Sequence, residues 1–180
     1  MTNHLVHAGS GQRWRIIGWG LAVGLLVLPF VAMRFTREVN WTPSDFVFAA
    51  ILLGSIGLGM EFAVRRSSNA AYRGGAALAL LASFLTVWIN GAVGMIGSED
   101  NPYNLLFALS ILAALIGAIL TRFRPQGMAR ATIAAGIVQA SLGLAGMFTD
   151  LRGGILTTVL ASLWVLAAAL FRKAEQDRAA

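Results

Sequence analysis

The chain has 180 residues, of which 57% are hydrophobic and only 12% are charged, and its mean hydropathy is +0.72. These values exclude an ordinary soluble domain and indicate an integral membrane protein. The sequence contains no cysteine, which excludes disulfides and thiolate chemistry. The net charge of +6 does not indicate nucleic-acid binding, because the basic residues form short groups at the ends of apolar runs.

We expect residues 1–15 to form a polar cytoplasmic tail. Its two histidines, His4 and His7, are a weak metal signal, because such a pair without further ligands is more typical of a solvated tail. Basic residues and an apolar run follow, as in a signal peptide, but this run extends over 16–33 and no A-x-A cleavage pattern follows it. An uncleaved first transmembrane helix is therefore expected.

Further apolar runs recur along the whole chain. A helix rises about 1.5 Å per residue, so about 20 mostly apolar residues cross the hydrocarbon core. Because lipid offers no partners to the backbone, these runs are expected to be helices. The spans are approximately 16–33, 44–64, 75–96, 104–121, 129–147 and 154–171. The sequence thus predicts an all-α membrane protein, with a single transmembrane domain of six helices over 16–171 and a cytoplasmic tail at 172–180.

The basic residues predict how this bundle is oriented. Eleven lysines and arginines fall on the side of the two termini, and three fall on the other side. Because Lys and Arg collect in cytoplasmic loops, both termini are expected in the cytoplasm. The acidic pair Glu99 and Asp100 is then expected at the outer mouth of the bundle.

Two helix starts on the outer side carry capping signals. The run TPSD at 42–45 combines an N-cap residue, a proline in the first turn and an acid three positions after the cap. Asn101 and Pro102 form a similar pair before the fourth helix. The connections are short, which makes consecutive helices antiparallel neighbours in one compact bundle.

Small and polar residues recur at the spacing of one helix face in several predicted helices. In lipid, close approach at small residues and hydrogen bonds between polar ones hold helices together, so these stripes are expected to be packing faces. The stripes are Gly20 and Gly24 in the first helix; Ala50, Gly54, Gly57 and Glu61 in the second; Ala76, Ala79, Ser83, Thr86, Asn90, Gly94 and Gly97 in the third; Ala113 and Gly117 in the fourth; and Thr132, Gly136, Gln139, Gly143, Gly146 and Asp150 in the fifth.

Some polar residues of these stripes are candidate site residues, and two interpretations stay open for them. They are interhelical contacts, or they line a path for an ion or a small solute. For Asn90 and Gln139 an interhelical hydrogen bond is sufficient. For Glu61 an ion pair with Arg65, four residues later, competes with a proton or cation site. The candidates are Glu61, Ser83, Thr86, Asn90 and Gln139.

No pattern predicts a catalytic, cofactor or metal site. None of the predicted helices contains a histidine, and the sequence has neither a phosphate-binding loop nor a serine beside a plausible base. Glu99 and Asp100 are adjacent at a turn, where they suit the positive end of a helix better than they suit catalysis. We therefore expect a protein that is not an enzyme and binds no cofactor.

Two loops resemble those of a known group of proteins. The run VGMIGSEDNP at 93–102 and the run FRPQGMARA at 123–131 are the most specific parts of a resemblance that covers about residues 41–145. The sequence resembles a group of small bacterial integral membrane proteins of unknown function. The resemblance implies a bacterial inner-membrane location, and it implies no activity, ligand or catalytic residue.

The leading functional hypothesis is a non-enzymatic inner-membrane protein, a structural or accessory component that associates with another copy or another membrane protein through its small-residue faces. The alternative is a small transporter or channel with a path lined by Asn90, Gln139 and Glu61. A third interpretation is a surface for anionic lipid headgroups, although topology alone explains its residues. These residues are Arg65, Arg66, Arg73, Arg122, Arg124 and Arg130.

Overall fold

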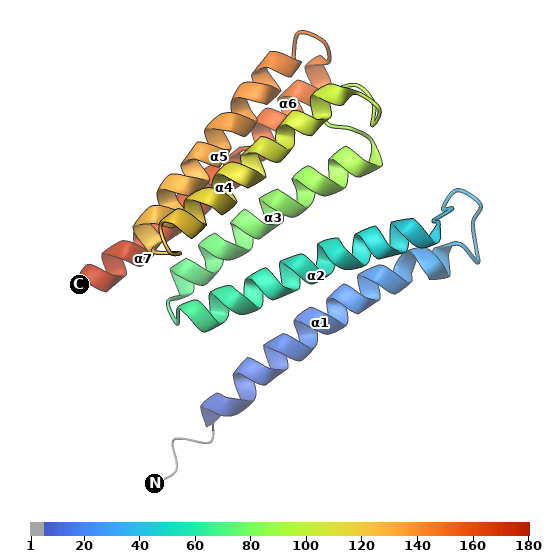
Figure 1. Cartoon of the computed structure of the whole chain (residues 1–180). Helices are drawn as coiled ribbons and strands as arrows, with labels where there is room; N and C mark the ends of the chain where they lie inside the picture. The colour runs from blue at the N-terminus through green and yellow to red at the C-terminus, as the bar shows by residue number, and fades with distance from the viewer. Residues whose placement is uncertain (1–5) are drawn as a thin grey trace. The chain divides into compact units, whose positions relative to one another are not determined.

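The computed structural model describes the backbone of residues 6–180 and the side chains of residues 15–180. Every regular element in this part of the chain is helical (Figure 1). Six helical segments within it are long and apolar enough to cross a membrane, which confirms the all-α fold with six transmembrane helices. The cytoplasmic placement of the termini stays a prediction. His4 and the side chain of His7 lie outside the described residues.

The helical elements follow the predicted spans closely, with two extensions at the ends of the chain. Helix α1 begins at Val6 rather than near Ile16, and the last helix continues to Ala179 through the segment predicted as a tail, which is rich in good helix formers. The elements are α1 (Val6–Ala32), α2 (Pro43–Arg66), α3 (Ala70–Ala92), the 3-10 helix η1 (Pro102–Phe107), α4 (Ala108–Leu120), α5 (Pro125–Gly146), α6 (Leu151–Leu160) and α7 (Ser162–Ala179).

The chain forms two compact units, the first ending at Phe62 and the second comprising Ala63–Ala180. The single transmembrane domain therefore stays a prediction. The first unit pairs α1 with most of α2, and the side chain of Trp19 lies against Gly57, 3.1 Å from where a Cβ atom would stand. Asp45 caps α2 as the TPSD run predicts, since its Oδ2 accepts hydrogen bonds from the backbone N–H and the hydroxyl of Thr42 at 2.7 and 2.8 Å.

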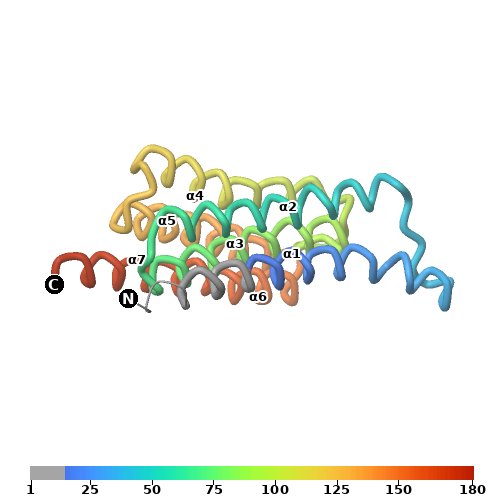
Figure 2. The backbone as a smooth tube through the Cα atoms, turned by 90° about the horizontal axis from the view of Figure 1, so that it is seen from below, coloured from blue at the N-terminus to red at the C-terminus, as the bar shows by residue number. Residues whose placement is uncertain are grey.

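The second unit is a bundle of four spans, in which η1 with α4 forms one span and α6 with α7 forms another. Its helices run side by side along one direction in Figures 1 and 2. Helix α5 contacts α4, α6 and α7, and α3 packs mainly on α7. The core is built on alanines with a few aromatic rings, among them Phe107, Trp164 and Phe171, all fully buried.

The small-residue face of α5 is buried as predicted, and Gly143 shows why it must be small. A Cβ atom at Gly143 would stand 2.6 Å from the Thr158 hydroxyl oxygen, 2.9 Å from the Thr158 backbone nitrogen and 3.1 Å from the Gly154 carbonyl oxygen. Two of these neighbours are backbone atoms of α6, which cannot rotate away. The absence of a side chain therefore lets α5 and α6 approach this closely.

We predict that Gly143→Ala destabilises the protein by about 1–3 kcal/mol, because the added methyl group overpacks the α5–α6 contact. The matched control is Gly24→Ala in α1, where no described atom of the first unit lies within 4 Å of the added Cβ. The control should be neutral or more stable by up to about 1 kcal/mol, from the better helix propensity of alanine. Thermal unfolding in detergent, followed by circular dichroism, measures both, and equal stabilities would contradict the prediction.

Candidate functional site

The side chain of Gln139 is fully buried in the second unit, where it meets the other three spans. Its Oε1 lies 2.8 Å from the indole Nε1 of Trp164 on α7. The same oxygen lies 3.3 Å from the hydroxyl of Thr86 on α3 and 3.3 Å from the hydroxyl of Ser110 on α4. One amide oxygen of α5 is thus a polar junction for the whole four-span unit.

The bonds at this junction differ in strength. Each hydroxyl has one hydrogen, and each also lies close to a carbonyl of its own span: Thr86 at 2.8 Å from Ala82 and Ser110 at 2.7 Å from Phe107. The indole of Trp164 can only donate, so its bond to Gln139 is the firm one and fixes the amide oxygen on that side. Among the described residues the Nε2 of Gln139 has no hydrogen-bond partner.

The other predicted site residues have separate surroundings. Ser83 donates to the Ala79 carbonyl of its own helix at 2.9 Å. Asn90 donates through Nδ2 to the Asn104 carbonyl at 3.2 Å, which places it beside the turn between α3 and η1. Of the predicted set in the second unit, the structure therefore joins Thr86 to Gln139, while Ser83 and Asn90 have other partners.

Glu61 belongs to the first unit and pairs with a residue that sequence reasoning did not consider. Its Oε1 lies 2.8 Å from Nη2 of Arg15 on α1, and the Glu61 side chain is 15% exposed. The spacing of four residues along one helix predicts Arg65 as the candidate partner of Glu61. The pairing of Arg15 with Glu61 depends on how α1 and α2 pack together, and the sequence alone carries no signal of it.

The turn between α3 and η1 is held by asparagine side chains. Asn104 accepts from the Ile96 N–H at 2.9 Å and donates to the Ser98 carbonyl at 2.7 Å. Asn101 donates to the Ile96 carbonyl at 3.0 Å and accepts from the Tyr103 N–H at 3.1 Å. The backbone here needs glycine at residues 94 and 97, where φ is +77° and +75°. The turn is therefore a rigid structural element.

Two exposed acids lie at the tip of the α3–η1 turn, and a third acid joins this turn to the start of α6. Glu99 and Asp100 are exposed. Asp150, which caps α6, accepts the Gly153 N–H at 3.0 Å and, from across the bundle, the Gly97 N–H at 2.9 Å. These backbone hydrogen bonds, that of Gly153 first, hold the pKa of Asp150 below its ordinary value of 3.8.

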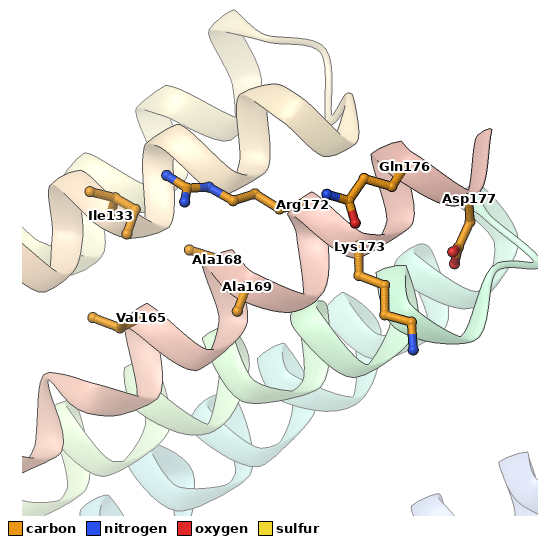
Figure 3. A pocket seen from close by; sticks show the side chains of 8 residues that line it. All are labelled: Ile133, Val165, Ala168, Ala169, Arg172, Lys173, Gln176 and Asp177. Carbon is orange, nitrogen blue, oxygen red and sulfur yellow. The ribbon is translucent and has the colours of Figure 1, made fainter. Parts of the chain in front are cut away.

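Two surface hollows lie elsewhere in the second unit, and neither is lined by a residue of the predicted path, although Arg122, Arg124 and Arg130 of the predicted headgroup surface line the larger one. One has a volume of about 410 Å³ between α5 and α7 (Figure 3). The other has a volume of about 710 Å³, lies beside the α4–α5 turn and the end of α7, and is mostly polar. Within the described residues, no group of three or more His, Asp or Glu side chains is placed to hold a metal ion.

Comparison of the chain with protein-family models, with curated proteins and with solved structures gives no match. The resemblance of the two loops to a group of bacterial membrane proteins therefore stays a prediction. What the site can do rests on its own geometry, which is that of buried interhelical contacts.

We predict that Trp164 and Gln139 are energetically coupled. Trp164→Phe keeps an aromatic ring but leaves the buried Oε1 of Gln139 without its firm donor, which should cost about 1–3 kcal/mol beyond the change in packing. In a Gln139→Leu background no such acceptor exists, so the same substitution should cost less. A double-mutant cycle by denaturant unfolding measures the coupling, expected at about 0.5–3 kcal/mol, and strictly additive effects would contradict it.

We also predict that Asp150 makes stability depend on pH in the acid range. Because its folded pKa is lowered, its contribution is fully present above about 3.8 and is lost as the pH falls through the folded value. Asp150→Asn should therefore be less stable than the natural chain at pH 7, and the difference should shrink below pH 3.8. Melting temperatures across this range test it, with Asp100→Asn as the control on an exposed acid. A pH-independent difference would overturn the assignment.

Proposed function

We propose that this multi-pass membrane protein is a non-enzymatic structural or accessory component of the bacterial inner membrane, with both termini in the cytoplasm. The location rests on the resemblance of its loops. The orientation rests on charge. Hydrogen bonds join the start of α3 to the α4–α5 turn and to the end of α7, through Tyr72 to Phe123 and Asn69 to Asp177, so these segments share one end of the unit. That end is rich in arginine, as cytoplasmic ends are.

The observation that carries the structural role is the burial of Gln139. It is the most polar side chain in the middle of its span, and none of its surface is exposed. Its oxygen lies within hydrogen-bond distance of Thr86, Ser110 and Trp164, so the candidates Thr86 and Gln139 contact each other and two further side chains of the bundle. Such an arrangement favours interhelical fixation over passage of a solute.

Association with a partner is assigned to the small-residue faces of the first unit. The glycines of α5 are buried within the second unit itself, so they contact neighbouring helices of the same chain. In contrast, within the first unit no atom of the described residues lies within 4 Å of the Cβ positions of Gly20 and Gly24 on α1 or of Gly54 on α2. Glycines spaced by four on one helix allow a second helix to approach closely.

The transporter alternative requires a continuous polar path, and the contacts described above leave it little support. Glu61 is ion-paired with Arg15 and Gln139 exposes no atom. The test is a flux assay with the purified protein in liposomes. Selective conduction or exchange that is lost in Glu61→Gln would favour transport. Equal flux in liposomes with and without the protein would count against it.

We predict that the protein crosslinks to a second tagged copy, or to another membrane protein, in native membranes, and that Gly20→Leu with Gly24→Leu reduces the crosslinked fraction at least about fivefold by blocking close helix approach. The control pair, Leu21→Phe with Leu25→Phe, enlarges the side chains one position further along α1, on a face about 100° away around the helix. This control should crosslink as the natural chain does. A strictly monomeric protein with no crosslinked neighbour would refute the proposal.

A further inference from the structure

The polar hollow of about 710 Å³ has an unusual concentration of guanidinium groups. It opens between the α4–α5 turn, the first turns of α5 and the last turns of α7, at the end of the second unit where α4 stops at Leu120 and α5 starts at Pro125. We call it the arginine pocket. Its lining side chains are Leu120, Thr121, Arg122, Arg124, Gln126, Arg130, Glu175, Arg178 and Ala179, with Gly127.

The charge of the arginine pocket is strongly positive. Three separate segments supply its cations: Arg122 and Arg124 from the turn, Arg130 from α5 and Arg178 from α7. Glu175 is the one acid among the lining residues, so the arginines outnumber it. Positive charges that gather from different segments repel one another, and an anion between them relieves this repulsion.

The backbone that presents the arginines is fixed by bonds that do not use them. The hydroxyl of Tyr72 donates to the Phe123 carbonyl at 3.0 Å, and the Thr121 hydroxyl donates to the Gly117 carbonyl at 2.7 Å. The side chains of Arg124 and Arg130 are exposed at their surface. A fixed backbone with exposed guanidinium groups means that binding an anion requires only side-chain adjustment.

The start of α5 adds to the attraction for an anion. Arg124 is its N-cap residue, and the Arg124 side chain makes no capping hydrogen bond to the first turn of this 22-residue helix. The free N–H groups and the helix dipole at this end favour negative charge. The pocket therefore combines convergent guanidinium groups, whose fork matches phosphate oxygens, with backbone donors.

We propose that the arginine pocket binds a phosphate group, supplied by the headgroup of an anionic phospholipid. The position favours this source, because the pocket lies where the α4 and α5 spans end, which is the level of lipid headgroups. Soluble phosphate has the same chemistry and is the second source to test. The proposal is independent of how the protein associates with partners.

The surface hollow between α5 and α7 supplies a matched control pair of two positive charges at the same end of the unit. Arg172 and Lys173 line it, and Figure 3 shows them leaving α7 in different directions. Neither residue lines the arginine pocket. Neutralising this pair changes the net charge as much as neutralising two pocket arginines, so general attraction to an anionic surface affects both variants equally.

The experiment is native mass spectrometry of the full chain in detergent, titrated with phosphatidylglycerol and, separately, with phosphatidylcholine. We expect preference for phosphatidylglycerol and a roughly ten- to thirtyfold weaker affinity in Arg124→Gln with Arg130→Gln, on the scale of two lost lipid–arginine interactions. Arg172→Gln with Lys173→Gln should change the affinity by less than about threefold. Glu175→Gln should tighten binding, an opposite sign that a folding defect would not produce.

Calorimetry with inorganic phosphate distinguishes the two sources. If phosphate binds with the same dependence on Arg124 and Arg130 while phosphatidylglycerol does not, the pocket takes free phosphate. If neither probe binds, or if the pocket variant and the control variant lose phosphatidylglycerol equally, the arginine pocket is not a phosphate site and the proposal is overturned. Circular dichroism of each variant confirms that the helices are retained.

Discussion

The second unit depends on the hydrogen bond between Gln139 and Trp164. In the middle of a membrane neither the Gln139 oxygen nor the Trp164 indole N–H finds water, so each must find its partner within the protein. The buried oxygen of Gln139 lies within hydrogen-bond distance of side chains from α3, α4 and α7, and its firm bond to Trp164 fixes α5 against α7. Around this junction the alanines and glycines of α5 set how closely the helices approach.

The two ends of the unit are held by different chemistry. At the α3–η1 turn, the side chains of Asn101, Asn104 and Asp150 bind backbone groups, so the polar residues of the loop are used in its own structure. At the α4–α5 turn, the backbone is held by Tyr72 from α3, and the arginine side chains are left at the surface. The first end leaves the acids Glu99 and Asp100 at its surface, whereas the second presents arginines.

The spans, the cap of α2 and the packing face of α5 could be predicted from the sequence, because each depends on neighbours within one helix. Hydropathy marks the spans, the TPSD run marks the cap, and the spacing of Gly136, Gln139 and Gly143 marks the face. Contacts between distant segments could not be predicted. Ser110 lies in an otherwise apolar run and Trp164 reads as ordinary core, so only the bundle geometry shows that both meet Gln139. For the same reason Arg15 was missed as the partner of Glu61.

The order of the residues around Gln139 has a consequence for how the chain matures. Helices enter a membrane from the N-terminus onward, so Thr86 and Ser110 are in place when Gln139 arrives, and its one obligate donor, Trp164, is inserted last. Until the final span enters the membrane, the side-chain amide of Gln139 lacks the indole donor of Trp164. The nascent protein thus carries a buried amide oxygen without its firm donor until the last span completes the bundle.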